Sequence, residues 1–231
     1  MTAKRIVWSK FLNAGQTCIS PDYVLVDKSI EKALLDALKV EIEACFDNKS
    51  RFDENYLQII NTKNFDRLSK LVKSGQVYFG GILNRDERFI SPTILHHVTF
   101  TDEVMKEEIF GPILPVISFA NLEKSIAEVK SRPKPLSCYI YSKNRKTIRN
   151  LLKTLSFGGG AINDSVMHLT NSKLPFGGVG FSGIGSYHGK AGFEAFTHYK
   201  SILDKPFWFE PNIKYAPYSK WKKAVIKWMM E

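Results

Sequence analysis

Short apolar runs alternate with longer segments of helical periodicity along most of this chain, and this alternation limits its possible folds more than any other feature. Residues 23–26, 113–119 and 137–141 are such runs, and each has the length and composition of a buried strand. The segments after them repeat apolar residues at helical spacing. Strands connected through helices form a mostly parallel sheet with helices on both faces, so we predict an α/β fold.

The same patterns predict the other elements and a division of the chain into two parts. Pro92 interrupts an extended segment, which indicates an edge or an irregular position there. We assign residues 1–197 to one domain and residues 198–231 to a tail. The predicted helices cover residues 4–13, 27 to about 46–48, 55–72, 122–130 and 143–155, and the further strands cover residues 77–79, 89–95 and 160–163.

Composition and cysteine spacing argue against several classes of protein. With 44% apolar and 13% aromatic residues, the chain has the composition of a globular protein. No apolar stretch reaches the roughly 18 residues of a membrane-spanning helix. The N-terminus lacks the apolar core of a signal peptide, so we expect a cytoplasmic protein. Cys18, Cys45 and Cys138 are widely spaced, so we expect neither a disulfide framework nor a metal site.

The net charge of +10 would attract nucleic acid or an anionic membrane. The lysines are nevertheless scattered through helix-like segments, without a zinc-finger, RNA-recognition or helix-turn-helix signature. We therefore expect a solvated basic surface and no nucleic-acid partner. Residues 221–230 have the composition of a helix that lies on a membrane, but a terminal helix that docks on the protein is the preferred interpretation.

Cys18 stands out among the three cysteines because of its local context. The preceding helical segment ends near Gly15, a residue that readily takes the left-handed conformation of a helix end. Pro21 ends the following turn, and a buried strand comes next. A thiol on such a turn is placed for chemistry, because backbone N–H groups there can face an anion. A buried structural cysteine is the alternative that local pattern leaves open.

Three motifs carry a family resemblance. The sequence GQTCISPDY at residues 15–23 resembles the nucleophile segment of the aldehyde dehydrogenases, in the form of their class 3 branch. KEEIFGP at residues 106–112 and LPFGGVG at residues 174–180, with SYHGK at residues 186–190, resemble later motifs of the same family. The resemblance covers nearly the whole chain but only the later half of the family's length. Residues 178–183 have the G-x-G-x-x-G form without a preceding strand, so we predict a loop there.

The resemblance implies a Rossmann-like catalytic domain that oxidises an aldehyde with NAD or NADP. Cys18 would be the catalytic nucleophile, which passes through a thiohemiacetal and a thioester. Glu108 would hold the nicotinamide ribose and Phe110 would pack beside the nicotinamide ring. Without the resemblance, the acidic residues before a Gly-Pro turn would be interpreted as a helix end.

The resemblance also implies which residues form the substrate side of the site and how subunits pair. Trp8, Thr170, Phe176 and His188 would line the substrate side. Residues 201–204 resemble the strand that the family uses for subunit pairing, so we expect a homodimer.

The family places its nucleotide-binding sheet before the nucleophile, and only 17 residues precede Cys18 here. We therefore expect the N-terminal cofactor domain to be missing and this chain alone to be inactive. Two alternatives remain open. One is a cysteine-dependent esterase or acyl-transfer enzyme that uses Cys18 with His188, and the other is a non-catalytic dimerisation fragment.

Overall fold

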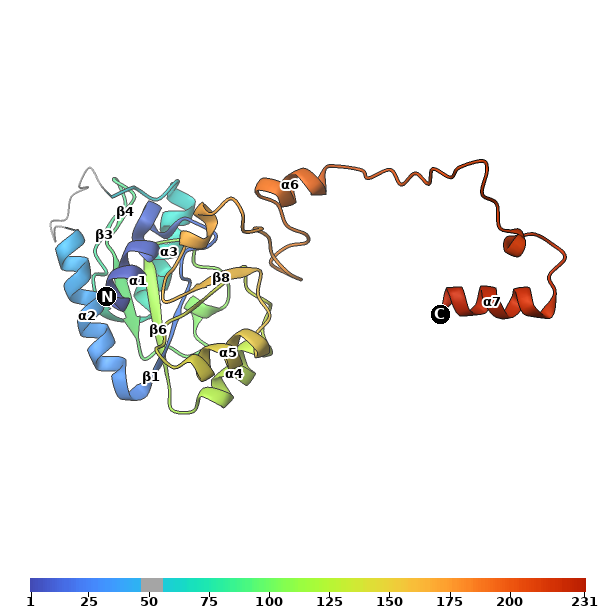
Figure 1. The fold of residues 1–231 in the computed structure, drawn as a ribbon. Coiled ribbons are helices and arrows are strands. Elements are labelled where there is room, and N and C mark those ends of the chain that lie inside the picture. The colour runs from blue at the N-terminus through green and yellow to red at the C-terminus, as the bar shows by residue number, and fades with distance from the viewer. Residues whose placement is uncertain (47–55) are drawn as a thin grey trace. The chain divides into compact units, whose positions relative to one another are not determined.

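The computed structural model describes residues 1–46 and 56–231. The chain divides into two compact units, Met1–Phe196 and Thr197–Glu231, and each is described by itself. Figure 1 shows the elements of both. The helices are α1 Thr2–Phe11, α2 Glu31–Cys45, α3 Thr62–Ser74, α4 Leu122–Lys130, α5 Arg145–Thr154, α6 Gly189–Ala195 and α7 Lys220–Met230. The strands are β1 Val24–Asp27, β2 Gln76–Phe79, β3 Leu83–Asn84, β4 Phe89–Ile90, β5 Thr93–His96, β6 Ile113–Phe119, β7 Ser137–Ile140 and β8 Gly159–Ile162.

The main sheet has four strands in the order β1-β6-β5-β2. β6 pairs in parallel with β1 and β5, and β2 runs antiparallel to β5 at the edge. Ile113, Leu114 and Val116 of the central strand are fully buried, as expected for a strand covered on both faces. α1 and α2 pack against each other beside this sheet (Figure 1). The predicted α/β fold with a mostly parallel sheet is confirmed.

The predicted strand at residues 89–95 is two strands. Pro92 lies between β4 and β5, which pair with different partners, β3 and β6. The irregular position expected for this proline is therefore confirmed, since proline has no N–H to donate to a ladder.

The second predicted helix begins later than expected. α3 starts at Thr62, where the side chain of Asn61 accepts a hydrogen bond from Asn64 N at 2.9 Å. Leu57 and Ile60 have the spacing of a buried helix face in the sequence, but they precede the helix and are 55% and 69% exposed. The predicted start at residue 55 and the predicted end of the preceding helix beyond residue 46 lie outside the described residues.

β7 and β8 form a separate two-stranded parallel sheet, with Cys138 opposite Gly160. Among the described residues, this parallel pair is separate from the four-stranded sheet. Glycine at position 160 is required by space, because a Cβ there would lie 1.9 Å from the carbonyl oxygen of Cys138.

The tail unit, Thr197–Glu231, contains one α-helix in its described residues, α7. Its formation confirms the predicted terminal helix, whose docking on the protein stays a prediction. Residues 201–204 form no strand, and Ile202 and Leu203 are exposed. Across the described ranges, none of the helices is both long and apolar enough to cross a membrane.

Candidate active site

Cys18 lies on a short, strongly turned segment between α1 and β1. After α1, residues Leu12–Gly15 form a 3-10 turn in which Asn13, Ala14 and Gly15 all have positive φ angles. A second turn follows, Thr17 to Ser20, closed by a 2.9 Å hydrogen bond from Ser20 N to Thr17 O. We call residues 17–20 the cysteine turn. Cys18 is exposed at its tip, so the open alternative of a buried structural cysteine is wrong.

The cysteine turn is anchored on its inner side. Ile19 is fully buried, and the Ser20 hydroxyl donates to Lys10 O at 3.1 Å. The hydroxyl of Tyr139, on β7, donates to Ile19 O at 2.8 Å. These contacts fix the backbone on either side of Cys18 while its side chain faces solvent.

Residues 12–22, which we call the cysteine segment, lie directly against residues 106–112, which we call the acidic segment. A Cβ on Gly15, whose φ is +71°, would lie 2.3 Å from Gly111 O. Asp22 accepts a hydrogen bond from Ile109 N at 3.0 Å. The structure therefore brings together two of the motifs that the sequence singled out.

Within the acidic segment, buried Ile109 separates two exposed side chains, Glu108 and Phe110. Arg67 of α3 donates to Glu107 Oε1 at 3.2 Å and to the carbonyl oxygens of Glu108 and Ile109. Phe110 has φ +49°, a conformation that is uncommon for an aromatic residue, and it stays 42% exposed. The fold thus holds both predicted cofactor residues at the surface on a braced backbone.

A buried lysine lies behind these motifs. Lys10 is only 1% exposed, and burial lowers its pKa to about 8, although Asp22 and Glu108 act in the opposite direction. Burial also raises the pKa of Glu108, as does Asp22, whereas Lys10 and Arg67 lower it. One cation therefore lies among the carboxylates of both motifs.

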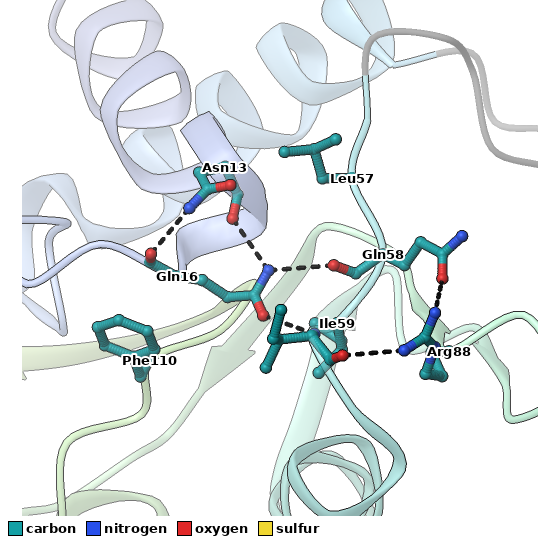
Figure 2. Close-up of a pocket in the computed structure, with 8 residues that line it drawn as sticks. Asn13, Gln16, Leu57, Gln58, Ile59, Arg88 and Phe110 are labelled. Carbon is teal, nitrogen blue, oxygen red and sulfur yellow. Dashed lines mark hydrogen bonds between the residues drawn. The ribbon is translucent and has the colours of Figure 1, made fainter.

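A pocket of about 450 Å³ opens beside the cysteine segment (Figure 2). Gln16 spans its floor, because its amide donates to Asn13 O and Gln58 O and accepts from Ile60 N at 2.9 Å. Phe110 forms the facing side. The residues that line the pocket are Asn13, Gln16, Leu57, Gln58, Ile59, Ile60, Arg88 and Phe110.

On another side of the cysteine turn, five rings contact each other in sequence, and we call them the aromatic row. Tyr139 meets His168 edge-on at 5.8 Å between centroids, and His168 lies 6.3 Å from Phe176. Phe176 meets Tyr187 at 5.8 Å, and Tyr187 meets His188 at 6.4 Å. Two predicted substrate-side residues, Phe176 and His188, therefore belong to one cluster that reaches the cysteine turn through Tyr139.

The other two predicted substrate-side residues are less closely tied to this cluster. Trp8 is half-exposed on α1, and Thr170 is exposed, with its hydroxyl donating to Met167 O at 2.9 Å. The glycine-rich stretch at residues 178–183 is a loop, as predicted. Its glycines serve close backbone packing, since a Cβ on Gly178 would lie 2.0 Å from Ser182 O.

The described ranges, residues 1–46 and 56–231, contain no group of three His, Cys, Asp or Glu side chains arranged to hold a metal ion. The other two thiols differ in their surroundings. Cys45 is exposed at the end of α2. Burial raises the pKa of half-buried Cys138 to about 11, so this thiol should react slowly.

A model described as the aldehyde dehydrogenase family matches residues 1–202. The chain belongs to this family. The 4,4'-diaponeurosporen-aldehyde dehydrogenase of Staphylococcus aureus is 45% identical over 98% of this chain and 50% of its own length. Aldehyde dehydrogenase family 3 member H1 of Arabidopsis thaliana is 40% identical over 100% of this chain and 49% of its own.

Two further comparisons bear on the branch and the fold. The Bos taurus aldehyde dehydrogenase named dimeric and NADP-preferring is 40% identical over 93% of this chain and 90% of its own sequence. A solved structure described as the substrate-bound state of Staphylococcus aureus AldH has a TM-score of 0.94 and 44% identity, covering 100% of this chain and 50% of the other. The chain therefore resembles the class 3 branch of the family, and it spans about half the length of the S. aureus and A. thaliana relatives.

Sequence reasoning missed three residues around the site. Lys10 falls on the same helical face as Ile6 and Val7, so the periodicity of the segment was a signal that could have identified it as buried. Asp22 lies inside a motif that was already quoted. Tyr139 carried no local signal, because its partner Ile19 is 120 residues away in the chain.

The Gly15–Gly111 contact makes a testable prediction about stability. Gly15→Ala would place a Cβ against Gly111 O at φ +71°, so it should lower the free energy of unfolding by at least about 2 kcal/mol. Gly185→Ala is a matched control, because Gly185 has φ +74° with nothing within 4 Å of the added Cβ. The control should lose about 1 kcal/mol from backbone strain alone. Urea unfolding measures both, and equal losses would contradict the close approach.

The burial of Lys10 predicts how the free energy of unfolding depends on pH. Its folded-state pKa of about 8 lies below the ordinary value of 10.5, so the unfolded chain binds more protons between these pH values. Stability should therefore rise with pH across this window. Lys10→Met removes this contribution, and between pH 7.5 and 9.5 the unmodified protein should gain about 1–2 kcal/mol over the variant in urea unfolding. If the difference in unfolding free energy between the two proteins does not change with pH, the lowered pKa of Lys10 is contradicted.

Proposed function

We propose that this chain carries the nucleophile and part of the cofactor site of an enzyme that oxidises aldehydes to carboxylic acids with NAD or NADP. One observation supports this most directly. The exposed thiol of Cys18 stands on an anchored turn whose neighbouring residue, Gly15, touches the segment that carries Glu108 and Phe110. A nucleophile and two cofactor contacts from distant parts of the chain therefore share one rigid surface.

The chemistry of these side chains fits a nicotinamide riboside. Glu108 offers a carboxylate at the surface, which suits the paired hydroxyls of a ribose. Phe110 offers an exposed ring at the edge of a pocket large enough for a flat heterocycle. When bound, NAD or NADP would supply the acceptor for the hydride that leaves the substrate carbon. The name of the bovine relative supports NADP as one of the two.

In the proposed reaction, the Cys18 thiolate forms a bond to the aldehyde carbon, and the carbonyl oxygen becomes an oxyanion. The backbone N–H of Cys18 is the donor proposed for that oxyanion. Loss of hydride from the carbon leaves a thioester on Cys18. Water then adds to the thioester, the carbon–sulfur bond breaks, and the carboxylic acid leaves while the thiol is restored.

The substrate side is proposed to accept apolar aldehydes with medium or long chains or aromatic groups. Phe176 belongs to the aromatic row that begins beside the cysteine turn, and Trp8 is half-exposed on the helix before it. Thr170 and His188 would add polar edges to this surface. The name of the S. aureus relative, an enzyme for a diaponeurosporen aldehyde, supports an apolar substrate.

The proposal also assigns a role to an exposed apolar surface. Leu12, Leu57, Ile60 and Phe110 are exposed around the cysteine segment and its pocket. A patch of this kind usually marks an interface. We propose that the part of the relatives' length outside this chain covers it and supplies the nucleotide-binding sheet, so that the chain as it stands does not turn over aldehyde.

The test uses the two exposed thiols, Cys18 and Cys45, as site and reference. Brief iodoacetamide treatment followed by mass mapping should label Cys18 faster. A long-chain or aromatic aldehyde at low concentration should protect Cys18 about tenfold and leave Cys45 unchanged, because only the site thiol forms a held thiohemiacetal. Incubation of the same chain with aldehyde and NAD or NADP should produce no reduced cofactor.

Other results would point elsewhere. Equal labelling of both thiols without protection would favour a non-catalytic dimerisation fragment. Ester hydrolysis that requires Cys18 and His188, without aldehyde protection, would favour a cysteine-dependent esterase or acyl-transfer enzyme. Reduced cofactor formed by the chain alone would contradict the proposed location of the nucleotide-binding sheet outside these residues.

A homodimer is the proposed assembly, supported by the word dimeric in the bovine relative's name. The exposed residues 201–204 would form a strand only on pairing with the second copy. Ile202→Pro removes a backbone donor, so sedimentation at micromolar concentration should shift from dimer to monomer. A monomer in the unmodified protein would contradict this assignment.

A further inference from the structure

Tyr139 makes a contact that the proposed chemistry leaves unexplained. Its hydroxyl, from the centre of β7, donates to Ile19 O at 2.8 Å, next to Cys18. Ile19 itself is fully buried, so its carbonyl would lack a protein partner at this position without the phenol. The small β7–β8 sheet is thereby joined to the cysteine turn, which otherwise follows α1.

The ring of Tyr139, like its hydroxyl, has a specific contact. His168 packs edge-on against it, and neither ring nitrogen of His168 has a hydrogen-bond partner among the described residues. Burial lowers the pKa of His168, which keeps this ring neutral beside the phenol. His168 in turn contacts Phe176, which belongs to the loop at residues 174–188 that we call the substrate-side loop. The position of the Tyr139 ring therefore depends on this loop.

The backbone that presents His168 is strained. Val166 has φ +64°, a region that β-branched residues rarely adopt, at the start of the short turn Met167–Thr170. Strain of this kind persists only where the surroundings enforce it, and it clusters at functional sites. Val166 is buried, and the turn that follows it carries His168, whose ring contacts Tyr139.

Tyr139 also stays protonated at neutral pH. Burial raises its pKa to about 12; Ser137 and the backbone of Val166 lower it by hydrogen bonding, and the charges of Tyr141 and Cys18 raise it slightly. The hydroxyl is therefore a permanent donor to Ile19 O and adds no negative charge next to the sulfur.

We propose that Tyr139 is a positioning residue for Cys18, which sets the cysteine turn through Ile19 O and couples it to the substrate-side loop through His168 and Phe176. This inference rests on the proposed role of Cys18. It predicts that the phenol oxygen, and not merely the ring, determines how the thiol is presented.

Tyr139→Phe tests the inference, because it removes one oxygen and keeps the ring that contacts His168. Tyr141→Phe is the matched control, since its hydroxyl lies nearby on the same chain segment but pairs with Ser165 Oγ at 2.7 Å. Amide hydrogen exchange of residues 17–22 should accelerate about fivefold to tenfold in Tyr139→Phe and stay unchanged in Tyr141→Phe. Alkylation of Cys18 by iodoacetamide should slow about threefold in Tyr139→Phe only, with Cys45 constant as the internal reference.

The outcomes are distinct from those for the proposed function. If the unmodified protein shows fast Cys18 and aldehyde protection, but Tyr139→Phe behaves identically, the positioning role is wrong and the function stands. Faster exchange without a change in Cys18 alkylation also overturns the role, as does acceleration of all peptides in both variants. Slow, unprotected Cys18 in the unmodified protein removes the function on which the inference rests.

Discussion

The contact of Gly15 with Gly111 sets the geometry on which the rest of the site depends. Two backbone segments approach so closely that a Cβ at Gly15 would lie 2.3 Å from a carbonyl oxygen. Backbone cannot move aside as a flexible side chain can, so this contact fixes the distance between the cysteine segment and the acidic segment. Asp22, which accepts from Ile109 N, and Arg67, which binds the carbonyls of the acidic segment, then maintain their relative orientation.

Much of the fold could be predicted from the sequence because buried positions of strands and helices recur at the regular spacing of each element. The central strand, Ile113–Phe119, is an apolar run in the sequence and is buried in the structure. Residues 57–60 show the limit of this reasoning. Leu57 and Ile60 have helical spacing, yet the Asn61 cap delays the helix, and Ile60 N pairs instead with the Gln16 side chain. That choice depends on a residue 44 positions away, which local pattern does not contain.

The candidate site divides in the same way. Cys18, Glu108 and Phe110 were assigned through resemblance to a family, and the structure places their segments in contact without testing their roles. The supporting residues could not be assigned so easily. A hydrogen bond such as Tyr139 to Ile19 follows from the packing of a second, smaller sheet, whose separation from the first was not visible in the alternation of elements.

The burial of Lys10 has a consequence for the proposed reaction, whose substrate is an electrophile. An amine whose pKa falls to about 8 is partly unprotonated near neutral pH, and such an amine condenses readily with aldehydes to form a Schiff base. Lys10 belongs to the helix that leads to Cys18, and its carbonyl contacts the cysteine turn. At 1% exposure its side chain is out of reach. The fold thus buries the Lys10 amine close to the cysteine turn and leaves the Cys18 thiol exposed, so that at the proposed site an aldehyde would meet the sulfur and not this amine.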